Sequence, residues 1–314
     1  MGIKIAPKII AGVVSAALYL IVFTFGLGFL FLFLPTLPIF WLGLSRRSDD
    51  ALHATLIATI ILALFSNPFS AVLIYLLCLG LPAWYIAHES MKFGSGSGLV
   101  VWFPLTIIFA RLMTVFAFIL LAVTLYYSST EGGLQGTITP FINDALTSFS
   151  KDIDEKTREV LQSAAPKLSF LIFAVSAWMW AACLYLHGWV VSRELRRQNI
   201  ATRPEMAIAA FPPPNWMISL LLLVAFASLV GSPSLAFWGK SSLIILLFPY
   251  FLFGMALLHI YTKKSEQRFL FLFCIYFVLA LLLWPVFIVA GYGFIYHIKM
   301  LNKYLSSGGT SSKR

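Results

Sequence analysis

Long segments without charge are the feature that most constrains this chain. Eight stretches of 18 to 38 residues contain no Asp, Glu, Lys or Arg: 9–44, 51–88, 93–110, 112–130, 168–192, 206–239, 241–262 and 269–298. About 20 apolar helical residues cross the hydrocarbon core of a bilayer, which is about 30 Å thick. Only 11% of the residues are charged, whereas soluble domains carry about a quarter. The sequence therefore predicts a polytopic membrane protein whose principal partner is the lipid bilayer.

Proline and glycine divide these stretches into helices. The first is broken by Gly26, Gly28, Pro35 and Pro38, and the second at the turn signal around Pro68. The segment 269–298 is interrupted at Pro285, so it either crosses once or forms a short re-entrant pair. The predicted fold is all-α, a transmembrane helix bundle of eight or nine crossings. The other predicted crossings are about 9–25, 28–44, 51–66, 69–88, 101–127, 167–190, 215–231 and 241–261.

One substantial polar segment, 129–166, separates the apolar runs. Within it, residues 138–164 carry apolar side chains at steps of three and four and charged side chains between them, which predicts one amphipathic helix outside the membrane. The Gly- and Ser-rich residues 94–98 are predicted to form a flexible link. We expect residues 1–305 to form a single membrane domain and residues 306–314 to be a disordered tail.

Basic residues in short loops predict the orientation, because cytoplasmic loops of membrane proteins carry an excess of Lys and Arg. If each helix crosses once, the basic clusters fall on one side, which places the N-terminus in the cytoplasm and segment 129–166 outside. The side of the C-terminus stays open, since it depends on whether 269–298 crosses or re-enters. We expect the protein in a bacterial cytoplasmic (inner) membrane. The clusters are Lys4/Lys8, Arg46/Arg47, Lys92, Arg193–Arg203 and Lys263/Lys264/Arg268.

The composition also argues against several functions. The net charge of +10 lies in short clusters that orient helices, so nucleic-acid binding is not expected. Neither a Cys/His cluster nor HExxH spacing occurs, which predicts no metal ion and no cofactor. There is no nucleotide-binding P-loop and no nucleophile–base pair, so the chain is not expected to be an enzyme. Ion-driven transport needs titratable groups within the membrane, and intramembrane carboxylates are nearly lacking here.

Three side chains within or beside the predicted helices are candidates for binding a small molecule. Arg111 is the obligate charge well inside a predicted helix, where an Arg costs about 3 kcal/mol on insertion scales and so tends to face a cavity or a partner. Alternatively, it extends toward the cytoplasmic interface. Trp178 and Trp284 lie away from the helix ends that other tryptophans mark. They line a pocket or, as tryptophans more often do, pack in the helix bundle.

The first predicted helix has a face of small residues, formed by Ala11, Gly12, Ser15 and Ala16. Small residues let membrane helices approach closely. This face either packs against another helix of the same chain or is a docking surface for a membrane partner.

Several short motifs resemble the DUF2232 family of multi-pass membrane proteins along nearly the whole chain. They include Leu37-Pro38-Ile39-Phe40-Trp41, Trp102-Phe103-Pro104-Leu105 and Pro214-Asn215-Trp216. This family is loosely similar to the substrate-binding S components of energy-coupling-factor transporters. The resemblance implies a component for small-molecule binding and uptake, with a membrane coupling subunit that docks on the first helix. The alternative is a structural or assembly protein that recruits a partner through helix 138–164 or the basic loop Arg193–Arg203, without a ligand.

Overall fold

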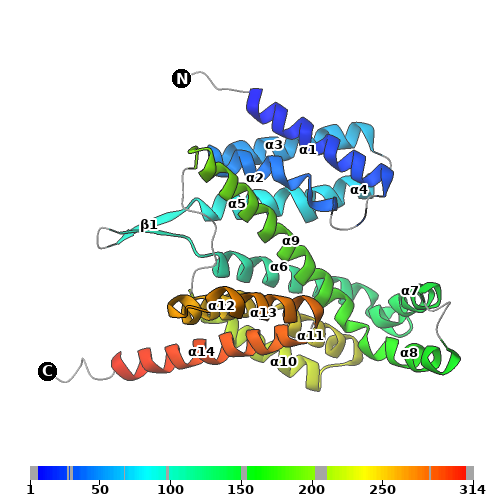
Figure 1. Ribbon diagram of the computed structural model, residues 1–314. Coiled ribbons are helices and arrows are strands. Elements are labelled where there is room, and N and C mark those ends of the chain that lie inside the picture. The colour runs from blue at the N-terminus through cyan, green and yellow to red at the C-terminus, as the bar shows by residue number, and fades with distance from the viewer. Residues whose placement is uncertain are drawn as a thin grey trace. The chain divides into compact units, whose positions relative to one another are not determined.

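The computed structural model describes residues 6–26, 28, 31–66, 68–96, 99–149, 154–201, 211–282 and 284–308 (Figure 1). The chain divides into two compact units. The first unit comprises Met1–Ile108 and Met179–Ala207, and the second unit comprises Phe109–Trp178 and Ile208–Arg314. The prediction that residues 1–305 form a single membrane domain stays a prediction.

The first unit contains five α-helices of its own and a β-hairpin. It also contains the start of α6 (Leu105–Tyr126) and the C-terminal part of α9 (Phe170–Arg197). Its own elements are α1 (Ala6–Phe25), the 3-10 helix η1 (Phe31–Phe33), α2 (Thr36–Ser45), α3 (Ser48–Phe65), α4 (Phe69–Ile74), the π-helix η2 (Tyr75–Gly80), α5 (Leu81–Ser90), β1 (Phe93–Gly96) and β2 (Leu99–Trp102).

The second unit contains the rest of α6, the first turns of α9 and all later helices. The elements that belong to it alone are η3 (Tyr127–Ser129), α7 (Gly133–Phe149), α8 (Glu155–Leu168), α10 (Trp216–Val230), α11 (Pro233–Ile245), α12 (Phe248–Tyr261), η4 (Thr262–Lys264), α13 (Arg268–Leu281) and α14 (Pro285–Gly308).

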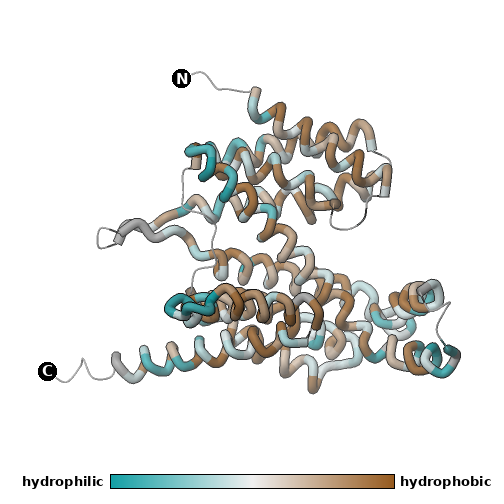
Figure 2. Tube along the Cα trace, viewed as in Figure 1, coloured by the Kyte–Doolittle hydropathy of each residue, from teal (hydrophilic) through white to brown (hydrophobic). Residues whose placement is uncertain are grey.

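Six helical segments of the described chain are long and apolar enough to cross a membrane: Ala6–Phe25, Ser48–Phe65, Phe69–Ser90, Leu105–Ser129, Phe170–Arg197 and Pro233–Lys264. Figure 2 shows apolar residues along these helices and hydrophilic residues gathered at α8 and at the turn after α12. Large apolar side chains also cover the outside, with Leu229 and Phe269 each 84% exposed. Water would disfavour such a surface and lipid solvates it. The prediction of a helical protein with several membrane-crossing helices is confirmed.

The structure departs from the predicted boundary of the second crossing. The segment predicted as one helix over 28–44 instead contains η1 and the ten-residue helix α2, which rises only about 15 Å. Pro35 precedes α2, and the Thr36 hydroxyl donates to the Phe33 carbonyl oxygen, at 2.7 Å, across the preceding turn. The proline and this local hydrogen bond start a new helix rather than continuing an old one.

The polar segment also differs from its prediction, because it holds two helices, α7 and α8, where one helix over 138–164 was expected. Asp154 ends the continuity: its carboxylate accepts a hydrogen bond of 3.0 Å from the backbone N–H of Thr157, which caps the start of α8. Residues 150–153, inside the predicted helix, lie outside the described residues.

The C-terminal segment is broken where Pro285 predicted a break. α13 ends at Leu281 and α14 starts at Pro285, which suits the first helical position because it needs no N–H partner. α14 then continues through residues 306–308 of the predicted tail, while residues 309–314 lie outside the described residues. Residues 94–96 of the predicted flexible link belong instead to β1, which pairs with β2 in an antiparallel hairpin, and residues 97–98 of that link lie outside the described residues.

Contacts in the first unit bring several helix ends together. Lys8 near the start of α1 forms an ion pair of 2.8 Å with Asp50 near the start of α3, so these two helices run in the same direction. At the end of α5, His88 Nδ1 lies 2.9 Å from the Ser48 hydroxyl. Arg46, after α2, shares a groove with the start of α1. The basic residues of the first loops therefore gather at one end of the unit.

In the second unit, glycine allows α12 and α14 to touch through their backbones. A Cβ on Gly254 would overlap the carbonyl oxygen of Val289, and a Cβ on Gly293 would overlap the carbonyl oxygen of Tyr250. Gly291, two residues before Gly293 on α14, has open space around it. The two close positions admit no side chain without separating the helices.

This packing predicts opposite effects for identical substitutions on neighbouring glycines. Gly254→Ala and Gly293→Ala should each destabilise the protein by roughly 1–3 kcal/mol, because the added methyl group forces the helices apart. Gly291→Ala is the matched control: it should be neutral or slightly stabilising, since Ala is the better helix former by about 1 kcal/mol. Thermal unfolding of the purified variants in detergent measures both effects. Equal thermal unfolding midpoints for all three variants would contradict the close backbone contact between α12 and α14.

The cap of α8 predicts a pH dependence. Hydrogen bonds from Thr157, first from its side chain and then from its backbone N–H, hold the pKa of the Asp154 carboxyl below its ordinary value. The stabilisation is therefore complete above the unfolded pKa of about 3.9 and is lost as the pH falls through the lower folded pKa. Amide exchange at residues 155–158, corrected for intrinsic rates, should show fraying only below about pH 4. Asp154→Asn keeps a capping oxygen but cannot titrate, so its protection should not change over this range.

Candidate functional site

The three predicted ligand-binding residues occupy different surroundings. Arg111 lies in the second turn of α6 with its side chain exposed. Trp284 precedes α14 and is 60% exposed. Neither residue lines any of the cavities described below. Their roles in ligand binding stay predictions.

Trp178 takes part in packing within the second unit. Its indole N–H donates to the carbonyl oxygen of Ile244 at 2.9 Å, and its ring meets those of Phe248, Phe251 and Phe287 at centroid distances of 5.3 to 6.2 Å. These distances are typical of aromatic pairs in protein cores. Of the two uses proposed for this residue, packing is the one with contacts in the structure.

The small-residue face of α1 is largely occupied within the chain. Gly12, Ser15 and Ala16 are buried, and a Cβ on Gly12 would lie 2.8 Å from the Ala54 carbonyl oxygen of α3. Packing inside the chain was one of the two predicted uses of this face. Ala11 differs from the other three, because it is only partly buried and lies at a groove.

A buried chain of hydrogen bonds joins this face to the π-helix. The Ser15 hydroxyl donates to the Pro35 carbonyl oxygen at 2.6 Å and lies 2.7 Å from the Tyr75 hydroxyl. Because the Ser15 hydrogen is used by Pro35, the Tyr75 hydroxyl is the donor to Ser15. The Tyr19 hydroxyl likewise donates to the Ala71 carbonyl oxygen at 2.7 Å. Ser15 of the predicted face thus links α1 to neighbouring segments of the same chain.

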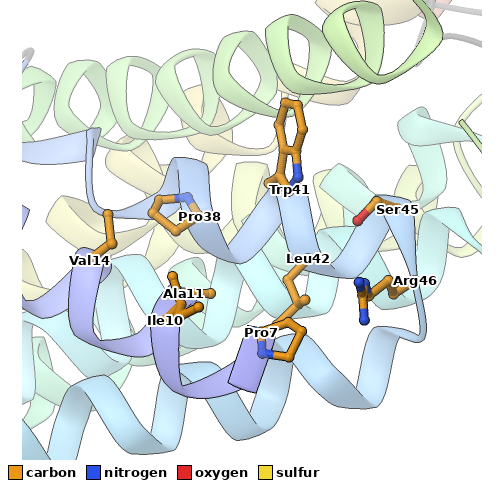
Figure 3. A pocket seen from close by; sticks show the side chains of 9 residues that line it. All are labelled: Pro7, Ile10, Ala11, Val14, Pro38, Trp41, Leu42, Ser45 and Arg46. Carbon is orange, nitrogen blue, oxygen red and sulfur yellow. The ribbon is translucent and has the colours of Figure 1, made fainter. Parts of the chain in front are cut away.

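The α1–α2 groove is an open cavity of about 360 Å³ in the first unit (Figure 3). Its walls are apolar except at one end, where Ser45 and Arg46 stand. α1 and α2 run in opposite directions along it, since Pro7 lies at the same end as Arg46 and Val14 lies near Pro38. The lining residues are Pro7, Ile10, Ala11, Val14, Pro38, Trp41, Leu42, Ser45 and Arg46.

A second cavity, of about 550 Å³, lies in the second unit, where the end of α6 meets the start of α11. We call it the hydroxyl cavity, because five of its ten lining residues are Ser or Thr and none is charged. Two left-handed glycines, Gly132 and Gly133, shape the turn that closes one side. The lining residues are Thr124, Leu125, Ser128, Thr130, Gly132, Gly133, Ser232, Pro233, Ser234 and Leu235.

Local hydrogen bonds decide what these hydroxyl groups offer. The hydroxyls of Thr124, Ser128 and Thr130 donate to backbone carbonyl oxygens of their own segments at 2.6 to 2.7 Å, so their oxygens remain as acceptors. Ser232 is the N-cap of α11, and its oxygen accepts from the backbone N–H of Leu235 at 3.4 Å, which leaves its O–H as a donor. The cavity therefore combines acceptors and a donor without formal charge.

Sequence reasoning missed this cavity although a signal was present. Residues 128–133 (SSTEGG) and 231–234 (GSPS) are both rich in Ser and Gly, and the predicted order of crossings puts both segments on the external side. From the sequence alone, residues 129–133 belong to the polar segment 129–166, and residues 232–234 have no predicted role. Among the residues that the structure describes, no group of three or more His, Cys, Asp or Glu could hold a metal ion.

The fold and the apolar helices define a multi-pass helical membrane protein. The chain belongs to the DUF2232 family, described as "Predicted membrane protein", whose model matches residues 13–295 of 314. No curated protein and no solved structure matches the chain.

The hydrogen-bond chain at Ser15 predicts an order of stabilities. Tyr75→Phe removes one donor and leaves Ser15 bonded to Pro35, so it should cost about 1 kcal/mol. Ser15→Ala also removes a single hydroxyl oxygen but strips both Tyr75 and the Pro35 carbonyl of a partner, and should cost roughly 2–4 kcal/mol, since each orphaned buried group costs about 1–3 kcal/mol. Thermal unfolding in detergent tests the order. If the Ser15→Ala variant proved as stable as the Tyr75→Phe variant, the hydrogen-bond chain would not be formed.

Proposed function

We propose that this protein is a non-enzymatic component of a bacterial cytoplasmic membrane that captures a neutral, polar small molecule for uptake. The hydroxyl cavity carries this proposal. Its volume of about 550 Å³ lies within the range of about 300–1,000 Å³ of small-molecule sites. Its acceptors and its donor suit a ligand that itself bears hydroxyl or amide groups.

The chemistry of the lining favours a ligand without charge. The cavity wall holds no Asp, Glu, Lys or Arg to compensate a buried ion. An ionised ligand moved from water into such surroundings would lose several kcal/mol of solvation without a compensating partner. A ligand with hydroxyl or amide groups exchanges its hydrogen bonds to water for bonds to serine and threonine.

The proposed topology makes the cavity reachable from outside. Six long candidate spans together with the segments of α2 and α10 give 6 + 2 = 8 crossings. The α13–α14 pair would then re-enter and return the tail to the cytoplasm. The gathering of Lys8 and Arg46 at one end of the first unit supports a cytoplasmic N-terminus. In this arrangement the polar helices α7 and α8 and the turn before α11 are external.

Uptake against a gradient needs energy, and a partner would supply it. The α1–α2 groove supports docking of a membrane coupling subunit, because Ile10 and Val14 are exposed along an apolar wall and Ala11 is the small residue left at the surface. Arg46 at the end of the groove would meet an acidic residue of that subunit. The predicted roles of Arg111 and Trp284 would lie outside the hydroxyl cavity.

A pair of conservative substitutions tests ligand capture. Ser128→Ala together with Thr130→Val removes two acceptors and leaves the volume nearly unchanged. We expect extracts of the purified wild-type protein to contain a small molecule, measured by untargeted mass spectrometry. The double variant should retain it at least about fivefold less, because two lost hydrogen bonds cost about 1–3 kcal/mol together.

The matched control is Thr147→Val with Ser148→Ala. These two residues also hydrogen-bond to backbone carbonyl oxygens one turn back, but they lie on the exposed face of α7, away from the cavity. The control should retain the molecule at the wild-type level. Ligand capture would be refuted if the extracts of all three proteins had the same contents and none contained a molecule enriched over a detergent blank.

A second function is favoured by a separate observation on the polar helices. Phe141 of α7 and Val160 of α8 are 72% and 59% exposed on the two helices of the polar segment. Exposed apolar side chains that form a contiguous patch mark contact with a partner. An assembly protein that recruits a partner through α7 and α8 would lose that partner on Phe141→Ser, whereas ligand retention would not change.

A further inference from the structure

A cavity of about 350 Å³ in the second unit carries two lysines in its lining, and we call it the lysine cavity. Lys167 comes from the last turn of α8 and Lys240 from α11. Both side chains are exposed, and among the ion pairs between described residues neither lysine has an acidic partner. No acidic residue lines the cavity. Two positive charges therefore face one hollow without compensation.

The junction of α8 and α9 also lines this hollow. α8 ends at Leu168 and α9 begins at Phe170, so Ser169 alone separates them, and both Ser169 and Phe170 line the cavity. The backbone N–H of Ile172 is bonded to the Ser169 carbonyl oxygen at 3.2 Å, so the positive charge of the cavity comes from the two lysines. Gln135 of α7 adds an amide to the lining. The Ser241 hydroxyl, bonded to the Phe170 carbonyl oxygen at 3.0 Å, fixes α11 to this end of α9.

We propose that the lysine cavity binds a phosphate group. Two ammonium groups match the charge and the several acceptor oxygens of a phosphate ester. The hydroxyl cavity has no lysine in its lining, so the two cavities differ in charge although Pro233 lines both. The phosphate belongs either to the headgroup of an anionic lipid or to a soluble phosphate ester.

The position of the cavity agrees with the depth of a lipid headgroup. The span Pro233–Lys264 has 32 residues, whereas about 20 are enough for the hydrocarbon core. Its surplus turns can lie in the headgroup layer, and Lys240 is seven residues from the beginning of the span, about 10 Å along the helix. Phe170 and Phe237 form apolar walls beside the lysines, where acyl chains could lie.

Binding of two probes to the purified full-length protein tests the proposal. Phosphatidylglycerol represents the lipid source and glycerol 3-phosphate the soluble source, and native mass spectrometry in detergent measures each. Lys167→Gln with Lys240→Gln should weaken binding of the recognised probe at least about tenfold, because each charge-assisted contact is worth about 1.5–3 kcal/mol. The control, Lys263→Gln with Lys264→Gln, alters two other exposed lysines and should bind like the wild type.

The pattern of results identifies the source of the phosphate. If the double glutamine variant binds only phosphatidylglycerol more weakly than the wild type does, the phosphate belongs to a lipid headgroup. If it binds both probes more weakly, the phosphate belongs to a soluble phosphate ester. If the double variant fails to fold, Lys240→Arg with Lys167→Arg retains both charges and should retain binding, and raising the salt from about 0.05 M to about 0.5 M should weaken it. The proposal is overturned if neither probe binds the wild type more tightly than the double glutamine variant, or if salt leaves the binding of the arginine variant unchanged.

Discussion

The backbone in a bilayer has no water to bond with, and this constraint governs the whole structure. Each N–H and C=O in the hydrocarbon region must find a partner within the protein, which favours helices for the crossing segments. Hydrophobic burial cannot hold these helices together, because lipid solvates apolar side chains as well as a protein core does. Side chains that donate to backbone carbonyl oxygens of neighbouring helices supply the specific links. Tyr19 to Ala71, Trp180 to Cys78 and Trp238 to Ala117 are such links, at 2.6 to 2.8 Å.

The π-helix η2 shows how an irregular backbone is accommodated under the same constraint. A π-turn widens the helix and shifts carbonyl oxygens away from their regular partners. The oxygen of Cys78, within η2, accepts the indole N–H of Trp180, and that of Gly80 accepts the Thr55 hydroxyl at a longer 3.5 Å. Tyr75, the first residue of η2, is held by Ser15. Trp180 and Thr55 thus donate to one distorted segment and Ser15 accepts a hydrogen bond from it, so three neighbouring helices contact η2 through polar side chains.

Sequence patterns predicted those parts of the fold that depend on solvent alone. Uncharged runs located the long helices, because crossing lipid requires about 20 apolar residues whatever the tertiary contacts. The start of α2 follows Pro35 and carries a local hydrogen bond of Thr36, and Asp154 caps the start of α8; an apolar pattern does not register such local bonds. The site was harder still. Packing within the chain was one of the two uses predicted for Trp178 and for the small-residue face with Ser15, and both residues have such contacts, whereas the hydroxyl cavity is built from Ser, Thr and Gly residues that are common in turns.

Both cavities of the second unit that carry polar groups share Pro233 and the beginning of α11, and the constraint on the backbone explains why. A helix start has unpaired N–H groups, so it needs polar neighbours, and Ser232 supplies a cap there. A polar cluster in the hydrocarbon core would cost several kcal/mol, whereas the surplus length of the span Pro233–Lys264 lets this helix start lie at the interface. Polar side chains cost little free energy where the helix extends beyond the hydrocarbon core. On this argument the interfacial turns of an overlong helix are the natural place for both a neutral ligand and a phosphate.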